Sequence, residues 1–127
     1  MRLLLDTSVL IDVLRLRHGR RDWLAQLARG GHSLSTTTLN VAELYAGMRP
    51  EEETQTEALL AGLESYEVNG TDARVAGKLK SSWARKGRTL TLDDAIIAAI
   101  TMERGCALVT DNRKDFPMPE VQLYPLP

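Results

Sequence analysis

Short apolar runs and helically spaced apolar residues alternate along the chain. Leu3-Leu4-Leu5 and Ala107-Leu108-Val109 are apolar runs without a polar face, which is typical of strands buried on both sides. Residues 33–37 alternate polar and apolar side chains, and residues 66–68 and 121–124 are further strand candidates. The pattern therefore predicts short strands spread over the whole chain.

Between these strands, apolar residues recur at the spacing of helices. Asp6-Thr7-Ser8 is predicted to cap a helix that carries Val9, Leu10 and Val13 on one face. Further helices are predicted over residues 22–29, from 40 to about 47, from 50 onward, from 71 or 72 to about 85, and from 93 or 94 onward. Because strands and helices alternate, the predicted fold class is α/β. We expect a three-layer α/β/α sandwich with a mostly parallel central sheet, in a single domain over residues 1–127.

Composition adds little beyond this picture. The 127 residues suit one domain, and the single cysteine excludes an internal disulfide framework, so a reducing, cytoplasmic location is expected. Cys106 adjoins an apolar run and is predicted to pack in the core rather than act as a nucleophile. The first apolar run ends at Asp6, far short of the ~20 residues that a membrane span needs. The net charge of −1 gives no global attraction to nucleic acid, so a polyanion would need local basic patches or metal ions.

Acidic residues stand at the ends of the predicted strands and at the starts of the predicted helices. Asp6 follows the first strand, Asp111 follows the strand at 107–109, and Asp115 comes four residues later. Asp94 lies at a helix N-terminus, and Glu43 lies one turn into another helix. Ligand sites of open parallel sheets lie beyond the carboxyl ends of the strands, so these acids can face one edge.

Converging carboxylates without matching lysines raise one another's pKa values, and a divalent cation removes this repulsion. Oxygen-only ligands suit Mg²⁺ or Mn²⁺, and such an ion can activate water and neutralise charge on a phosphate. His18 and His32 are isolated in polar segments, so a zinc site is not expected.

Each acid also has a purely structural interpretation. Asp6 can serve only as a helix cap, and Glu43 can be an ordinary surface residue, although its apolar neighbours weaken that interpretation. Asp111 and Asp115 can be turn formers. Only their joint arrangement favours a metal site.

Four motifs together resemble a known family. They are Leu4-Leu5-Asp6-Thr7-Ser8, Asn40-Val41-Ala42-Glu43-Leu44 with Gly47, Asp94-Ala95-Ile96-Ile97-Ala98-Ala99, and the run from Val109 to Phe116. In this order, and over nearly the whole chain, they resemble PIN-domain ribonucleases, specifically the VapC-type toxins of type II toxin–antitoxin pairs.

The resemblance implies roles for individual residues. Asp6, Glu43 and Asp94 match the three acids that hold Mg²⁺ or Mn²⁺ in such enzymes. Asp94 is preferred to Asp93 because it heads the Asp-x-x-Ile-Ala-Ala pattern, which leaves Asp93 as the expected helix cap.

The fourth acid is less directly indicated. Many relatives carry an acid where this chain has Asn112, whereas others pair an asparagine there with an acid before the phenylalanine. Asp115 fits the second version and is predicted to be the fourth acid, with Asn112 as polar support and Asp111 in reserve. Thr7, Ser8 and Thr110 are expected to orient the carboxylates or a water molecule.

The implied activity is endonucleolytic hydrolysis of RNA phosphodiesters, with tRNA or ribosomal RNA as expected substrates. The resemblance also implies a homodimer and inhibition by a cognate VapB-like antitoxin. The candidate phosphate contacts are Arg113, Lys114, Arg85, Lys86 and Arg88, of which the first two neighbour the acids.

Two other functions compete with this hypothesis. A PIN-like domain that has lost catalysis can serve as an RNA- or protein-binding scaffold, but a scaffold does not need mutually repelling carboxylates. A phosphotransfer protein with an aspartate after its first strand typically carries Asp-x-Asp, and here Ser8 stands at the second acid position.

Overall fold

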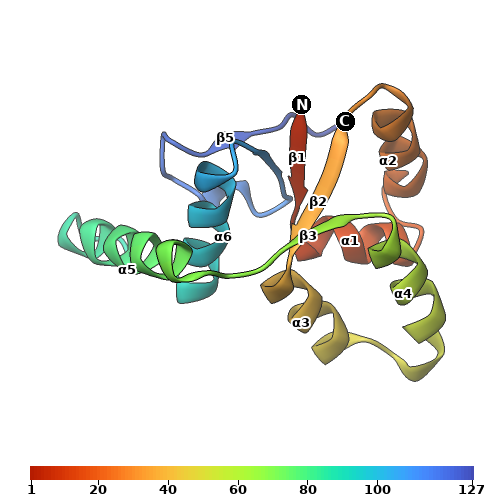
Figure 1. Cartoon of the computed structure of the whole chain (residues 1–127), viewed down its shortest axis with the longest axis horizontal. Helices are drawn as coiled ribbons and strands as arrows, with labels where there is room; N and C mark the ends of the chain where they lie inside the picture. Colours follow the sequence, from red (N-terminus) through yellow and green to blue (C-terminus); the bar gives the residue numbers. More distant parts are fainter.

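Five short strands form a fully parallel sheet at the centre of the structure (Figure 1). The computed structural model describes residues 1–127. The strands are β1 (Arg2–Leu5), β2 (Ser33–Thr37), β3 (Glu64–Tyr66), β4 (Ala107–Val109) and β5 (Gln122–Leu123). Their order across the sheet is β3-β2-β1-β4-β5, and every neighbouring pair is parallel. The first strand is therefore central, which explains why its sequence lacks a polar face.

Six α-helices connect the strands and cover both faces of the sheet. They are α1 (Thr7–Leu14), α2 (Arg20–Arg29), α3 (Thr38–Gly47), α4 (Glu53–Ala61), α5 (Gly70–Arg85) and α6 (Leu92–Glu103). Two short 3₁₀ helices, η1 (Pro50–Glu52) and η2 (Arg113–Asp115), complete the chain. The predicted α/β fold with a parallel sheet is confirmed, and the sheet has no antiparallel strand. No helix has the length and apolar character that crossing a membrane requires.

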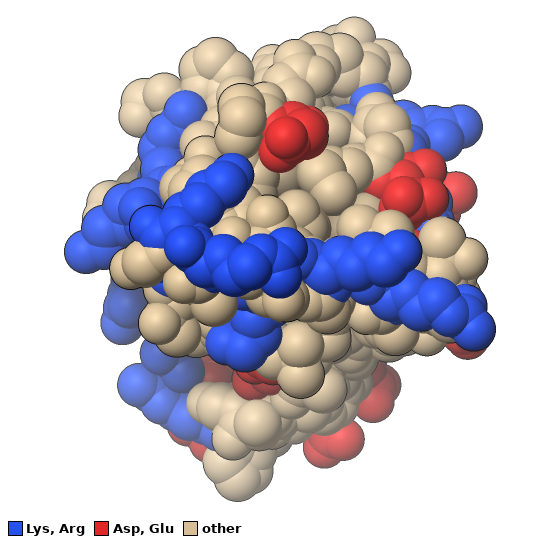
Figure 2. Space-filling view, turned by 90° about the vertical axis from the view of Figure 1, so that its left-hand side faces the viewer, with Lys and Arg blue, Asp and Glu red and all other residues tan.

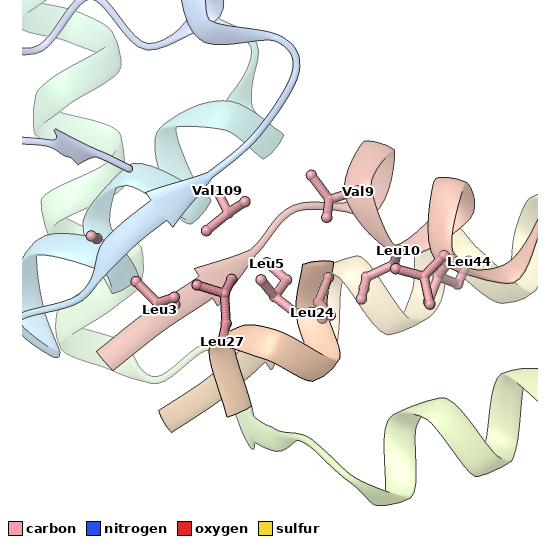
Figure 3. Packing of buried hydrophobic residues seen from close by; sticks show 10 residues of the cluster. Leu3, Leu5, Val9, Leu10, Leu24, Leu27, Leu44 and Val109 are labelled. Carbon is pink, nitrogen blue, oxygen red and sulfur yellow. The ribbon is translucent and has the colours of Figure 1, made fainter. Parts of the chain in front are cut away.

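The alternation of side chains along β1 divides the core into two parts. Leu3 and Leu5 pack with residues of α1, α2 and α3, as Figure 3 shows, whereas Leu4 packs with residues of α6 on the other face. All three leucines have no exposed surface. Burying one such side chain contributes about 1.5–3 kcal/mol, so β1 anchors the positions of the residues that follow it.

Several predicted boundaries shift in the structure. The strand at 33–37 is confirmed, but the strand predicted at 66–68 lies at Glu64–Tyr66, and the last strand is only Gln122–Leu123. The helix predicted from residue 22 already begins at Arg20. The helix predicted from residue 71 or 72 begins at Gly70, because the Asn69 side chain accepts a hydrogen bond from the Asp72 amide and caps it.

The prediction that Asp93 caps the sixth helix is wrong. Thr91 is the cap: its backbone is extended, and its hydroxyl oxygen accepts a hydrogen bond from the Asp94 amide at 3.1 Å. Asp93 and Asp94 both lie inside the first helical turn, where negative charge favours the helix dipole. In α3, Thr37 is the cap, and Asn40 lies in the first turn of that helix.

Three of these connections place polar residues at the carboxyl edge of the sheet. β1 leads directly into α1, β2 leads directly into α3, and β4 leads through a short turn into η2. Since the strands are parallel, their carboxyl ends meet at this edge. Glu43 and Asp115 lie in α3 and η2, and Asp6 and Asp111 lie in the connections before α1 and η2.

Candidate active site

Asp6 is the most firmly held acid at this edge. Its side chain caps α1 by accepting a hydrogen bond from the Thr7 amide at 2.9 Å through Oδ1. The same oxygen accepts from Asn40 Nδ2 at 3.0 Å, and Oδ2 accepts from the Thr110 hydroxyl at 2.7 Å. A carboxylate has about four lone-pair positions, so three donors fix its orientation and leave capacity for an ion. The capping and metal-binding interpretations of Asp6 are therefore compatible.

Glu43 is joined to Asp6 through two intervening side chains. The Thr7 hydroxyl donates to Glu43 Oε1 at 2.8 Å and accepts from Asn40 Nδ2 at 2.9 Å. Asn40 is fully buried, and its amide oxygen accepts a hydrogen bond from the Thr37 hydroxyl at 2.7 Å. The amide group of Asn40 thus bridges the first and third helices and orients two of the predicted ligands.

Sequence reasoning missed the part of Asn40 in this site. The residue was predicted only as the start of a helix and as part of a family motif. Its position three residues before Glu43 places both side chains on one helix face, and this spacing was an available signal.

Asp94 and Asp115 meet at a small cavity beside these residues. The cavity has a volume of about 120 Å³ and is lined by Arg88, Thr89, Leu90, Thr91, Asp94 and Asp115. Asp94 comes from the start of α6 and Asp115 from η2, so two segments distant in sequence converge here.

The negative charges of the acids at this edge influence one another's pKa values. Burial raises the pKa of Glu43; the hydrogen bond from Thr7 opposes this change, and the negative charges of Asp6, Asp93 and Asp94 add to it. Burial also raises the pKa of Asp94, opposed by the bond to Thr91 and reinforced by the charges of Asp115, Asp6 and Asp93. None of the four predicted acids forms an ion pair with a side chain. No ion pair within the protein therefore offsets their mutual repulsion.

The donor set fits a hard divalent cation. The available ligands are carboxylate oxygens, which suit Mg²⁺ or Mn²⁺, and the uncompensated charge favours a bound cation. As they stand, no three acidic, histidine or cysteine side chains are grouped closely enough to hold one ion. Among these acids, Asp6 has the most fixed side chain, because it accepts three hydrogen bonds.

Comparisons with known proteins identify the family. The profile of the PIN domain matches residues 3–119. The chain belongs to the PIN-domain family. Ribonuclease VapC19 of Mycobacterium tuberculosis is 31% identical over 120 residues, which cover 94% of this chain and 96% of that protein. Within the family, the chain thus belongs with the VapC ribonucleases, which generally depend on divalent metal ions.

More distant relatives agree with this assignment. Ribonuclease VapC2 of Haemophilus influenzae is 25% identical over 121 residues, covering 91% of this chain and 90% of that protein. The solved structure of VapBC2 from Rickettsia felis, bound to a DNA fragment from its promoter, matches with a TM-score of 0.87. That match is 21% identical and covers 98% of both chains, so it shows that the fold is shared.

The remaining polar residues predicted for this PIN domain have different surroundings. The Asp111 carboxylate is directed to Arg20, whose Nη2 donates to Oδ1 at 2.7 Å. Its amide donates to the Ser8 hydroxyl oxygen at 3.3 Å. Asn112 contributes through its backbone, because its amide donates to Thr110 Oγ1 at 3.0 Å. Asp111 and Asn112 thus form the turn after β4, and Ser8 contacts this turn. The Asp111 carboxylate is directed to Arg20 and not to the other acids.

The predicted phosphate contacts are all exposed. Arg88 Nη2 donates to the carbonyl of Lys114, and Arg113 Nη1 donates to the carbonyl of Tyr124 at 3.0 Å. Arg85 and Lys86 lie at the end of α5. Figure 2, which views the PIN domain from the α5 side, shows Lys and Arg side chains in a band across this face. Arg88 is the basic residue of this group that lines the cavity with two of the acids.

Cys106 and the two histidines lie outside the site. Cys106 is 5% exposed, and burial raises its thiol pKa, which agrees with the predicted packing role. His18 contacts Asp12 at 2.8 Å, and His32 stacks edge-on against Tyr124.

Proposed function

We propose that this chain is a divalent-metal-dependent endoribonuclease of the VapC type that hydrolyses RNA phosphodiesters. The observation that carries the proposal is the group of acids at the carboxyl edge of the sheet, which share one negative field and lack ion-pair partners. A catalytically silent scaffold has no use for such a cluster, because the repulsion destabilises the fold.

Asp6, Glu43, Asp94 and Asp115 are the proposed ligands of Mg²⁺ or Mn²⁺. When bound, such an ion lowers the pKa of a water molecule and neutralises charge that develops on the phosphate. Asp6 supplies the fixed carboxylate, since it accepts three hydrogen bonds. Glu43 and Asp94 are the candidate proton acceptors, because a raised pKa improves a carboxylate as a general base.

Asp115 is preferred to Asp111 as the fourth acid for two reasons. Asp115 lines the cavity with Asp94 and raises its pKa, whereas the Asp111 carboxylate is engaged by Arg20 at 2.7 Å. Thr7, Thr110 and Asn40 orient the ligands through the hydrogen bonds described above.

The RNA backbone is proposed to enter along the basic face next to the cavity. Arg88 reaches both the cavity and the carbonyl of Lys114, which places a cation beside Asp94 and Asp115. Arg113, Lys114, Arg85 and Lys86 are exposed and can contact neighbouring phosphates. Structured tRNA or ribosomal RNA remains the proposed substrate class.

A VapB-like antitoxin, a homodimeric state and a cytoplasmic location complete the proposal. The Rickettsia felis structure of the same fold is a VapBC complex, which supports an antitoxin partner. An apolar groove of about 440 Å³ between α1, α2 and α4, lined mainly by aliphatic side chains, offers a surface for that partner.

The decisive experiment compares RNA cleavage by the purified protein and by Asp6→Asn, with and without EDTA. Asp22→Asn is the matched control, since Asp22 is an exposed aspartate in α2. Cleavage that requires Mg²⁺ or Mn²⁺ and disappears in Asp6→Asn supports the proposal. Undiminished cleavage by Asp6→Asn contradicts the metal mechanism. RNA binding without cleavage by the wild type favours the scaffold function.

A further inference from the structure

Arg20, the first residue of α2, is a buried cation next to the site. Only 6% of the residue is exposed, and its guanidinium lies 5.7 Å from the centre of the Trp23 ring. Its Nη2 donates to Asp111 Oδ1 at 2.7 Å, whereas Nε and Nη1 have no hydrogen-bond partner. Nε lies 3.7 Å from Asp12 Oδ2, which is an ion-pair distance. Asp111 is thus the strongest partner of a charge that is costly to bury.

The connection before Arg20 holds it in place. Leu16, His18 and Gly19 all have left-handed backbone conformations, with φ values of 55°, 54° and 63°. Residues other than glycine rarely adopt this conformation, and they keep it where surrounding contacts enforce it. His18 Nδ1 contacts Asp12 Oδ2 at 2.8 Å, so the Asp12 carboxylate joins the tight turn to the buried arginine. Arg20 is therefore positioned by the backbone of residues 16–19 and by the Asp12 carboxylate, which lies before this turn.

Asp111, the partner of Arg20, adjoins the residue that orients Asp6. The Thr110 hydroxyl accepts a hydrogen bond from the Asn112 amide and therefore directs its own proton to Asp6 Oδ2, at 2.7 Å. Asp111 is held twice, by Arg20 at its carboxylate and by Ser8 at its amide. These two contacts of Asp111 consequently hold the turn at 110–112 in place.

We propose that Arg20 is a positioning residue for the candidate metal site. It pins Asp111, which fixes the turn at 110–112 so that the Thr110 hydroxyl points at Asp6. The same ion pair removes the Asp111 carboxylate from the set of possible metal ligands. The catalytic consequence rests on the proposed function, but the geometric role does not.

The first test measures binding of Mn²⁺ alone, by calorimetry, to Arg20→Met and to Arg21→Met. The control removes the same charge from the exposed neighbouring position of α2. Because residues that orient metal ligands affect affinity about 10–100-fold, we expect Mn²⁺ binding to weaken about tenfold in Arg20→Met and to stay unchanged in the control. Asp111→Asn should have a similar effect, and the double variant should be little worse than the stronger single variant.

The second test needs neither metal nor RNA. Amide hydrogen exchange of Asp111 and Asn112 should accelerate at least about tenfold in Arg20→Met but not in Arg21→Met, because the two amides lose their hydroxyl partners. Arg20→Lys, which keeps the charge, should restore part of the protection. If Arg20→Met does not fold, Asp111→Asn decides the matter by the same measurement.

With RNA as substrate, kcat should fall in Arg20→Met while KM stays constant, since Arg20 is not a phosphate contact. A folded Arg20→Met with wild-type Mn²⁺ affinity and unchanged amide exchange overturns the inference. Additive effects of Arg20→Met and Asp111→Asn also overturn it. A wild-type protein that binds no Mn²⁺ contradicts the proposed function instead, and the exchange experiment still decides the role of Arg20.

Discussion

Asp72 and the four acids of the candidate site differ in whether the protein supplies an ion-pair partner. Asp72 is fully buried, and both its oxygens accept hydrogen bonds from Arg104, at 3.1 and 3.0 Å. It also accepts from the Asn69 amide as part of the cap of α5. Asp6 and Glu43 accept hydrogen bonds from neutral groups. None of the four acids of the candidate site forms an ion pair, namely Asp6, Glu43, Asp94 and Asp115.

The difference separates structural from functional acids. A buried carboxylate with its own arginine stabilises one arrangement of the chain and has little left to offer a ligand. A group of carboxylates without cations keeps its charge available, and an ion from solution can supply the compensation. Asp111 resembles the first kind in having an arginine partner, although its side chain is more exposed than that of Asp72 and in the sequence it stands among the second.

Loss of an unpaired acid should have the largest effect on activity. Asp94→Ala should reduce RNA cleavage on the order of 1000-fold, because several kcal/mol of transition-state stabilisation depends on a bound ion. Cleavage rates at saturating Mg²⁺ measure the effect. Glu120→Gln, at an exposed position after η2, is the control and should retain full activity. A comparable loss of cleavage in Glu120→Gln would show that the effect is not specific to the unpaired acids.

Loss of the paired acid should reduce stability instead. Asp72→Asn leaves Arg104 without its charged partner and weakens the cap of α5, so the free energy of unfolding should fall by about 3 kcal/mol. Urea titration measures this change, and Asp22→Asn should shift stability by less than about 0.5 kcal/mol. The fraction of Asp72→Asn that remains folded should bind Mn²⁺ as the wild type does.

The pH dependence of stability should carry the signature of the unpaired acids. The pKa values of Glu43 and Asp94 are raised from their ordinary values of 4.5 and 3.8, so the folded state binds more protons than the unfolded state above those values. Without metal, their contribution to stability is therefore lost as pH rises through the raised pKa values. The melting temperature of Asp94→Asn in EDTA at pH 7 should exceed that of the wild type, by no more than about 3 °C because solvent screens part of the charge.

Mn²⁺ should reverse this order. It should raise the melting temperature of the wild type by mass action and raise that of Asp94→Asn much less. If the wild type is more stable than Asp94→Asn in EDTA, the repulsion between the acids does not destabilise the fold.

The smallest effect on activity is expected from substitutions on the basic face. Arg88→Gln should raise KM for RNA a few-fold and reduce the salt dependence of binding by roughly one released counterion, with kcat nearly unchanged. Arg29→Gln, an exposed arginine at the end of α2, is the matched control. Equal effects in both variants would show that only overall charge matters and that Arg88 has no special position beside the cavity.

Much of the fold followed from local patterns. The fully apolar Leu3-Leu4-Leu5 run predicted a buried strand, and β1 is a buried strand that the structure places at the centre of a parallel sheet. The positions of Asp6, Glu43 and Asp94 relative to strands and helix starts predicted a shared edge, and their mutual influence on pKa agrees with that placement. Their role as metal ligands remains a prediction that the experiments above test.

The wrong predictions concern the ends of helices and strands. Thr91 rather than Asp93 caps α6, and a strand predicted at 66–68 ends at Tyr66. A cap is selected by the backbone conformation of one residue, and threonine and aspartate are both good caps. A sequence pattern therefore locates such a boundary only to within a few residues.

The sequence alone determined the alternation of strands and helices, the buried first strand and the acids at strand ends, because each follows from the local pattern of apolar and polar residues. Only the tertiary structure decided which polar groups pair. Asn40 meets Asp6 across 34 positions, and Arg20 meets Asp111 across 91. Such partners are brought together by the crossing of helices over a parallel sheet, and no local pattern records that distance. In the folded chain Asp111 forms an ion pair with Arg20, whereas the other four acids form no ion pair.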